Sequence, residues 1–283
     1  MKAYTYSAGL NTNNVSAVIL PLIGRGKNVL EVGCSAGAQS QPMVQELGCT
    51  VTGVEIDPTQ AEGARAWCKK VLLGDILSMD LASALGDERF DVITFSDVLE
   101  HLRDPAKALE RVLPFLTADG CVIASIPNIT HSAIVWELAH GRFEYRRHGL
   151  LDDTHVRFFS RRSVAALFEQ AGMVVSRWER FVATPAATEF KVLPSTVKDS
   201  AFFDFVRENN PDAETYQFVV CAKRAAYQKN VELPKMIDLE RTNRDLAQQL
   251  ELTRKENSTL KSQVDWLDAR RLSVRVKRFF RTD

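Results

Sequence analysis

The chain has 283 residues, of which 45% are hydrophobic and 25% charged, and this balance predicts a globular protein with a sizeable core. Its 36 basic and 36 acidic residues cancel, so no overall charge selects nucleic acid as a partner. No stretch approaches the roughly 20 apolar residues that span a bilayer, and the N-terminus lacks an apolar signal core, so a cytoplasmic protein is expected.

Short apolar stretches alternate with helical patterns over the first half of the chain. The expected strands are 28–32, 50–55, 70–73, 90–95 and 120–126. The expected helices lie near 12–24, 37–47, 58–68 and 105–116. This alternation predicts βαβ units, a parallel sheet with right-handed crossovers, and helices on both faces. Two later strands are expected at 172–182 and 215–223, and a long loop with one helix near 198–208 is expected over 184–213.

The first strand leads directly into a glycine-containing turn, Val29-Leu-Glu-Val-Gly-Cys-Ser-Ala-Gly37. In an open α/β sheet this is where a nucleotide-like cofactor binds. The turn reads Glu31-x-Gly33-x-Ser35-x-Gly37, whereas a dinucleotide site uses GxGxxG to approach a pyrophosphate. An acid at the strand end suits an ammonium group, which S-adenosylmethionine carries. Packing of a strand against a helix is the alternative explanation of the turn.

The next strand ends add further polar groups. Glu55 ends the second strand, where a carboxylate can accept from both ribose hydroxyls. Asp75 and Ile76 follow the third strand and suit the amino group and the ring of adenine, although Gly-Asp also makes an ordinary turn. Ser96 ends the fourth. The predicted cofactor site contains Glu31, Gly33, Ser35, Gly37, Glu55, Asp75, Ile76 and Ser96.

Residues 28 to 126 resemble a class I S-adenosylmethionine-dependent methyltransferase. The family's acidic-glycine loop corresponds to VLEVGCSAG, its ribose acid to Glu55, its adenine segment to GDI at 74–76, and its fourth-strand motif to FDVITFSDVLEHL. The resemblance implies a Rossmann-like sheet and S-adenosylmethionine as cofactor. The sequence departs from the family at Ser35, where a second glycine is more usual and the backbone is freer.

Methyl transfer needs a base near the fourth strand end, because the acceptor must lose its proton. His101 is the expected base, since an imidazole titrates near neutral pH. Two alternatives stay open. Asp97 and Glu100 have the spacing of a helix capping box. Asp97, Glu100 and His101 also suit a hard divalent cation that orients a substrate oxygen, as in some relatives with a similar LEH segment, although the main prediction includes no metal.

All five histidines lie between residues 101 and 155. The segment SIPN…GRFEY…GLLDDTHVRFFS resembles methyltransferases found with glycosyltransferases in bacterial surface-polysaccharide assembly, and the likeness covers roughly residues 4 to 223. It implies a sugar hydroxyl or sugar-linked phosphate as acceptor and a glycosyltransferase as partner. It places five residues at the acceptor: His131, Tyr145, Asp153, His155 and Arg157. We expect His131 and His155 to join His101 in catalysis.

A methyltransferase domain at 1–223 and a linker at 224–234 are followed by a seven-residue apolar repeat over 235–269. Asn243 and Asn257 in its seam favour a parallel coiled-coil homodimer or low oligomer, because each amide can pair with its symmetry mate. A surface helix packed on the enzyme is the alternative. The basic amphipathic tail at 270–283 predicts peripheral contact with the inner face of the membrane, docking to a partner protein, or a solvated end.

Other function classes stay open. The domain could be a catalytically inactive scaffold that organises a glycan-assembly complex through its coiled coil, with Ser35 as its only support. It could also methylate a small molecule. An NAD(P)-dependent oxidoreductase is disfavoured, because neither the turn nor a hydride-transfer set is present. The five cysteines are odd in number and lack metal-type spacing, so reduced thiols are expected.

Overall fold

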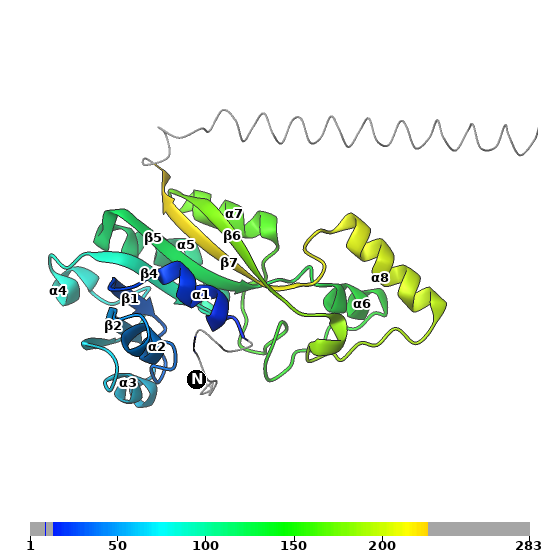
Figure 1. Ribbon diagram of the computed structural model, residues 1–283, viewed down its shortest axis with the longest axis horizontal. Coiled ribbons are helices and arrows are strands. Elements are labelled where there is room, and N and C mark those ends of the chain that lie inside the picture. The colour runs from blue at the N-terminus through cyan, green and yellow to red at the C-terminus, as the bar shows by residue number, and fades with distance from the viewer. Residues whose placement is uncertain (1–8, 10–13, 226–283) are drawn as a thin grey trace, which may run out of the picture. The chain divides into compact units, whose positions relative to one another are not determined.

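A seven-stranded mixed sheet forms the centre of the computed structural model, which describes residue 9 and residues 14–225 (Figure 1). The strands lie in the order β3-β2-β1-β4-β5-β7-β6. Their bounds are β1 Asn28–Val32, β2 Thr50–Glu55, β3 Lys70–Leu73, β4 Phe90–Ser96, β5 Leu116–Pro127, β6 Met173–Val182 and β7 Thr215–Arg224. Strands β1 to β5 pair in parallel, and β7 lies antiparallel between β5 and β6. The predicted Rossmann-like α/β sheet is confirmed, with one antiparallel strand that the sequence does not reveal.

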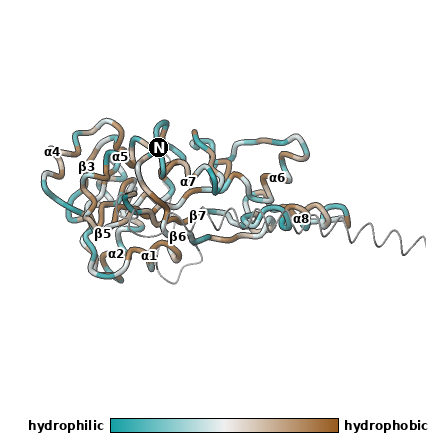
Figure 2. The backbone as a smooth tube through the Cα atoms, turned by 90° about the horizontal axis from the view of Figure 1, so that it is seen from above, coloured by the Kyte–Doolittle hydropathy of each residue, from teal (hydrophilic) through white to brown (hydrophobic). Residues whose placement is uncertain are grey.

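The central strands are buried on both faces, as expected of a parallel sheet covered by helices. Their side chains alternate between two hydrophobic clusters because successive residues point to opposite faces. In β1, Leu30 and Val32 belong to one cluster and Val29 belongs to the other. The hydrophobic stretches gather in the sheet and its covering helices (Figure 2).

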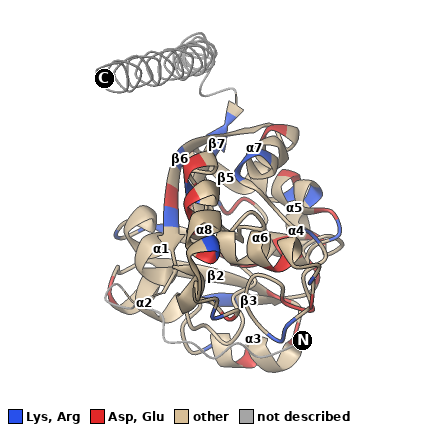
Figure 3. Ribbon diagram, turned by 90° about the vertical axis from the view of Figure 1, so that its right-hand side faces the viewer, with Lys and Arg blue, Asp and Glu red and all other residues tan. Residues whose placement is uncertain are grey.

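Helices cover both faces of the sheet, as the alternating pattern predicts. One face packs against α1 (Ser16–Ile23), α2 (Ser40–Gln45) and α3 (Pro58–Ala64). The other face packs against α4 (Leu81–Leu85), α5 (Pro105–Val112) and α7 (Arg161–Gln170). The strand β6 carries charges of both signs on its exposed side, among them Arg177 bonded to Glu179 at 2.8 Å (Figure 3). None of the described helices is long and apolar enough to cross a membrane.

Two further helices, α6 (Ser132–Ala139) and α8 (Val197–Asn209), lie side by side (Figure 1). They are joined by a small aromatic cluster in which Trp136 stacks on Phe203 with ring centroids 5.2 Å apart. The helix predicted near 198–208 is therefore confirmed. The stretch between β5 and α7, residues 128–160, includes α6 and reaches the turn after β4, where Val156 and Arg157 donate to the backbone oxygen of Glu100.

The predictions for the linker, coiled coil and basic tail fall almost entirely on residues 226–283, which lie outside the described residues. They stay predictions, as does the homodimer that depends on them. The five cysteines, all of which lie in the described part of the chain, are free thiols.

Candidate active site

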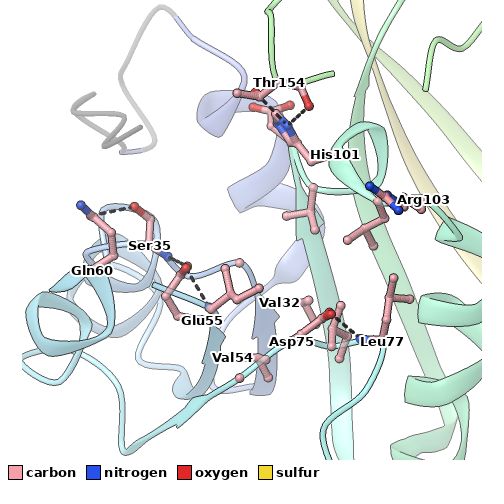
Figure 4. Close-up of a pocket in the computed structure, with 17 residues that line it drawn as sticks. Val32, Ser35, Val54, Glu55, Gln60, Asp75, Leu77, His101, Arg103 and Thr154 are labelled. Carbon is pink, nitrogen blue, oxygen red and sulfur yellow. Dashed lines mark hydrogen bonds between the residues drawn. The ribbon is translucent and has the colours of Figure 1, made fainter. Parts of the chain in front are cut away.

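A pocket of about 470 Å³ opens at the carboxyl ends of the central strands. The structure brings six of the predicted site residues into its lining: Gly33, Ser35, Glu55, Asp75, Ile76 and His101. Figure 4 shows Ser35 and Glu55 on one side of the pocket, and His101 beside Thr154 at another. The pocket therefore joins the predicted cofactor residues to the predicted base.

Glu55 connects the turn after β1 to the turn after β2. Its Oε2 accepts a hydrogen bond from the backbone N–H of Ser35 at 2.8 Å, and its Oε1 accepts from those of Ile56 and Asp57 at 2.8 and 2.9 Å. A carboxylate offers about four acceptor sites, so these three bonds leave one for a ribose hydroxyl. Glu55 thus fixes both turns and keeps one acceptor site for a ribose hydroxyl, where two hydroxyls are expected from the sequence.

The turn after β1 needs backbone conformations that favour glycine. Gly33 has φ +75°, and a Cβ atom there would lie 2.6 Å from Cγ2 of Val98. Ser35 also has a positive φ, 48°, and this explains why a glycine is usual at its position. The serine is held there by a hydrogen bond of 3.2 Å from its hydroxyl to Oε1 of Gln60. The departure from the family pattern therefore leaves a positive-φ turn in place.

Asp75 and Ile76, which are predicted to hold adenine, both line the pocket. Asp75 Oδ1 accepts from the backbone N–H of Leu77 at 2.8 Å, which fixes the carboxylate. Ile76 is buried, and Arg111 donates to its backbone oxygen. A fixed acceptor beside an apolar side chain suits an amino-substituted aromatic ring, so these residues, like Glu55, fit S-adenosylmethionine.

Three predicted cofactor residues do not line the pocket: Glu31, Gly37 and Ser96. Glu31 is 2% exposed, and Ser40 donates a hydrogen bond to its carboxyl group. Burial raises the pKa of Glu31 to about 8, so the group is protonated at neutral pH. Glu31 therefore lies behind the turn as a buried, protonated acid, and its predicted contact with the ammonium group stays a prediction.

His101 lies at the end of a 3-10 turn, Leu99–His101, directly after β4. Its Nδ1 lies 3.2 Å from the backbone oxygen of Thr154 and 3.1 Å from the hydroxyl of the same residue. Burial lowers the pKa of His101, so the ring is neutral at neutral pH and can accept a proton. No side chain caps this turn, so the capping-box alternative for Asp97 and Glu100 is wrong.

Asp97 also lines the pocket, in a backbone conformation with φ 55°. Its Oδ1 accepts from the hydroxyl of Ser125 at 2.8 Å and from Nε2 of Gln217 at 2.6 Å. Burial raises the pKa of Asp97 to about 6. Ser125 lies on β5 and Gln217 on β7, and the sequence offers no signal that would join Gln217 to this site.

Glu100, His101 and His155 form a cluster in which one ligand atom from each lies within 4.8 Å of the others. Both carboxyl oxygens of Glu100 are buried without a hydrogen-bond partner among the described residues. Burial raises the pKa of Glu100 well above its usual range and lowers that of His155 to about 4, so both favour the neutral form. This is where a cation would fit among the described residues, and Asp97 is not part of the cluster.

His131, predicted to be catalytic, is fully buried away from the pocket. Its Nδ1 accepts from the backbone N–H of Ala133 at 3.1 Å, and its Nε2 donates to the oxygen of Ala183 at 2.9 Å. Both ring nitrogens are used, so His131 caps α6 and holds a loop. His155 is also outside the pocket lining. The same holds for three further residues that the subgroup resemblance places at the acceptor: Tyr145, Asp153 and Arg157.

A family model described as a methyltransferase domain matches residues 10–176, which is more than half of the chain. The chain therefore belongs to the methyltransferase domain family. Its class is that of the class I S-adenosylmethionine-dependent methyltransferases, in agreement with the strand order and with the pocket at the strand ends.

Curated relatives share part of this domain. The ubiquinone biosynthesis O-methyltransferase of Actinobacillus pleuropneumoniae serotype 5b (strain L20) is 34% identical over 119 residues, which are 38% of this chain and 49% of the relative. The protein of the same name from Aeromonas salmonicida (strain A449) is 25% identical over 186 residues, 64% of this chain and 77% of the relative. The chain spans about half the length of the first curated relatives that it matches.

The fold is similar to that of a solved SAM-dependent methyltransferase from Archaeoglobus fulgidus. The TM-score is 0.53 at 18% sequence identity, with 74% of this chain and 90% of that chain covered. At this identity the likeness concerns the fold alone.

The predicted surface-polysaccharide function is wrong. The curated relatives are named for ubiquinone biosynthesis. In addition, the residues that the subgroup resemblance places at the acceptor do not line the pocket. The glycan acceptor that rested on this resemblance is therefore dropped.

Proposed function

We propose that the protein transfers the methyl group of S-adenosylmethionine to a hydroxyl oxygen of a small molecule. The observation that carries the proposal is the presence of Glu55, Asp75 and His101 in the lining of one pocket of about 470 Å³. The first two suit the ribose and adenine of the cofactor, and the third suits the proton of an acceptor.

S-adenosylmethionine supplies a methyl group on a sulfonium, whose S–CH₃ bond breaks as the acceptor oxygen bonds to the carbon. The protein must align that oxygen and remove its proton. His101 is suited to the second task because it is neutral and half-buried at the pocket wall. The thioether product leaves without a proton, so the proton stays on the His101 imidazole until solvent takes it.

The acceptor that we propose carries a phenolic hydroxyl. A phenol has a pKa of about 10, as in tyrosine, and a neutral imidazole removes such a proton far more readily than that of an alkyl alcohol. The names of the curated relatives point the same way, because they are O-methyltransferases of ubiquinone biosynthesis. A small phenol therefore suits a neutral imidazole base and agrees with the names of the curated relatives.

The test is a transfer assay with methyl-labelled S-adenosylmethionine and the full chain. A dihydroxybenzene is compared with cyclohexanediol, which has the same number of hydroxyls without their acidity. We expect labelled methyl ether and an equal amount of S-adenosylhomocysteine with the dihydroxybenzene only. Transfer to cyclohexanediol alone, or to neither compound by a protein that binds S-adenosylhomocysteine, would contradict the proposal.

A further inference from the structure

The segment 150–157 lies against the turn that carries His101, although it is about fifty residues further along the chain. The backbone N–H groups of Val156 and Arg157 both donate to the backbone oxygen of Glu100, at 2.9 and 3.0 Å. The rings of His155 and His101 meet edge-on, with centroids 4.9 Å apart and an interplanar angle of 67°. These contacts fix the segment beside the predicted base.

A chain of hydrogen bonds runs from this segment to the imidazole. Asp152 is 1% exposed, and its Oδ1 accepts from the backbone N–H of Thr154 at 2.8 Å and from the hydroxyl of Thr154 at 2.5 Å. The same hydroxyl oxygen lies 3.1 Å from Nδ1 of His101, and the backbone oxygen of Thr154 lies 3.2 Å from it (Figure 4). Asp152 thus reaches His101 through Thr154.

The direction of these bonds determines which ring nitrogen carries the proton. A threonine hydroxyl has one hydrogen, and that of Thr154 is directed to the carboxylate of Asp152. Toward His101, both oxygens of Thr154 can then only accept, so Nδ1 must be the donor. In a neutral imidazole the other nitrogen, Nε2, is left with the lone pair.

We propose that Thr154 and Asp152 are positioning residues, which hold His101 in the Nδ1-protonated tautomer so that Nε2 receives the proton of the acceptor. The inference rests on the proposed function and adds to it the atom that acts as base and the residues that select it. The other titratable groups near the ring are Glu100 and His155, with Asp97 in the same pocket lining. Neither Thr154 nor Asp152 belongs to the cofactor motifs of the sequence.

The first test is nitrogen-15 NMR of the full chain with S-adenosylhomocysteine bound and its histidine rings labelled, at a pH where His101 is neutral. We expect His101 to show a protonated Nδ1 and an unprotonated Nε2. A ring protonated at Nε2 would overturn the proposal. Because no acceptor is present, this result is independent of whether the proposed methyl transfer occurs.

Three variants test the role of the contact. Thr154→Val removes the hydroxyl acceptor and leaves the backbone oxygen of residue 154 as the remaining acceptor for Nδ1. We expect part of the His101 population to shift to the Nε2-protonated tautomer and kcat to fall about tenfold, with KM and S-adenosylhomocysteine affinity within twofold. Thr154→Ser keeps the hydroxyl and should restore both tautomer and kcat. Asp152→Ala removes the carboxyl oxygen that accepts from the Thr154 hydroxyl, which can then donate to Nδ1 and favour the wrong tautomer, with a larger loss of kcat.

Thr94→Val is the matched control, because the Thr94 hydroxyl is also buried in this domain but has no partner among the described residues. It should leave the tautomer and kcat unchanged. Equal tautomers and rates for Thr154→Val and Thr154→Ser would contradict the positioning role. Should the native tautomer be as expected while no phenol is methylated, the proposed function fails and the positioning of His101 stands.

Discussion

The residues that we assign to the cofactor and those that we assign to the acceptor are held in the pocket in different ways. On the cofactor side, each group follows a strand directly: Gly33 after β1, Glu55 at the end of β2 and Asp75 after β3. On the acceptor side, His101 contacts Thr154, 53 residues away, and Asp97 contacts Gln217, 120 residues away. The residues on the cofactor side are therefore placed by local sequence motifs. Those on the acceptor side come together only when distant segments of the chain pack.

The largest expected effect is a loss of catalysis without a loss of cofactor binding. His101→Gln removes the base, and we expect kcat to fall by about a thousandfold, within the range of general-base catalysis. Affinity for S-adenosylhomocysteine should stay within threefold, because no cofactor group is changed. Steady-state kinetics and calorimetry measure the two quantities. His140→Gln, at an exposed position, is the control. A parallel loss of S-adenosylhomocysteine binding in His101→Gln would show that the cofactor and acceptor sides do not act independently.

The next largest effect is expected on cofactor affinity, when a residue on the cofactor side is changed. Glu55→Gln puts an amide where a carboxylate accepts three backbone N–H groups, so at least one donor is left facing a donor. Loss of charged hydrogen bonds of this kind costs up to about 3 kcal/mol, so affinity for S-adenosylhomocysteine should fall by about a hundredfold in calorimetry. Glu62→Gln, on the exposed side of α3, is the control. Unchanged affinity in Glu55→Gln would remove this residue from the site.

The variant Glu31→Gln tests whether the acid of the turn motif after β1 stabilises the fold instead of binding the cofactor. The pKa of Glu31 is about 8 in the folded protein and 4.5 for an ordinary glutamate, so the unfolded chain releases the proton first as pH rises. The associated stability is present below pH 4.5 and is lost as pH approaches 8. Between pH 6 and pH 7 the free energy of unfolding should fall by about 1.4 kcal/mol more in the native protein than in Glu31→Gln.

Denaturant titrations at the two pH values measure this difference. Glu31→Gln should also bind S-adenosylhomocysteine with unchanged affinity, because Glu31 does not line the pocket. A large loss of affinity, with no difference in pH dependence, would assign Glu31 to the ammonium after all.

The smallest effect is expected at Ser35. Ser35→Gly removes the strain of a non-glycine residue at positive φ, which stabilises the folded state by about 1 kcal/mol. It also removes the hydrogen bond to Gln60 and gives the unfolded chain more conformational freedom, and both changes lower the free energy of unfolding. We expect a net change below about 1 kcal/mol in thermal unfolding and unchanged cofactor affinity. Gly33→Ala is the contrasting variant, since its Cβ would meet Val98 at 2.6 Å. It should be clearly destabilised, and equal behaviour of the two variants would contradict this account of the turn.

Much of the fold follows from local patterns in the chain. The predicted strands 28–32, 50–55 and 70–73 match β1, β2 and β3 residue for residue. The fifth strand begins at Leu116 instead of 120, because Asp119 and Gly120 resemble a turn while the ladder to Phe90 continues across an irregularity. The helix predicted to 116 ends at Val112, since Pro114 follows within a 3-10 turn.

The residues of the candidate site show the same difference between local patterns and distant contacts. Glu55, Asp75 and Ile76 could be predicted because each stands at a strand end, where position determines the environment. His131 has the same residue type as His101, yet tertiary contacts make it a helix cap. Gln217 carries no local signal, and Thr154 stands in the segment GLLDDTHVRFFS without a predicted role. The contacts of both residues depend on pairing across β5, β7 and the segment 150–157.

Calorimetric titration of the full chain with S-adenosylhomocysteine, and in parallel with NAD⁺, tests most directly whether the pocket accepts this nucleoside. We predict saturable binding of one S-adenosylhomocysteine per chain, weakened about a hundredfold in Glu55→Gln, and no heat of binding with NAD⁺. Binding of NAD⁺ at this pocket, or the absence of any S-adenosylhomocysteine binding by a folded protein, would contradict the account.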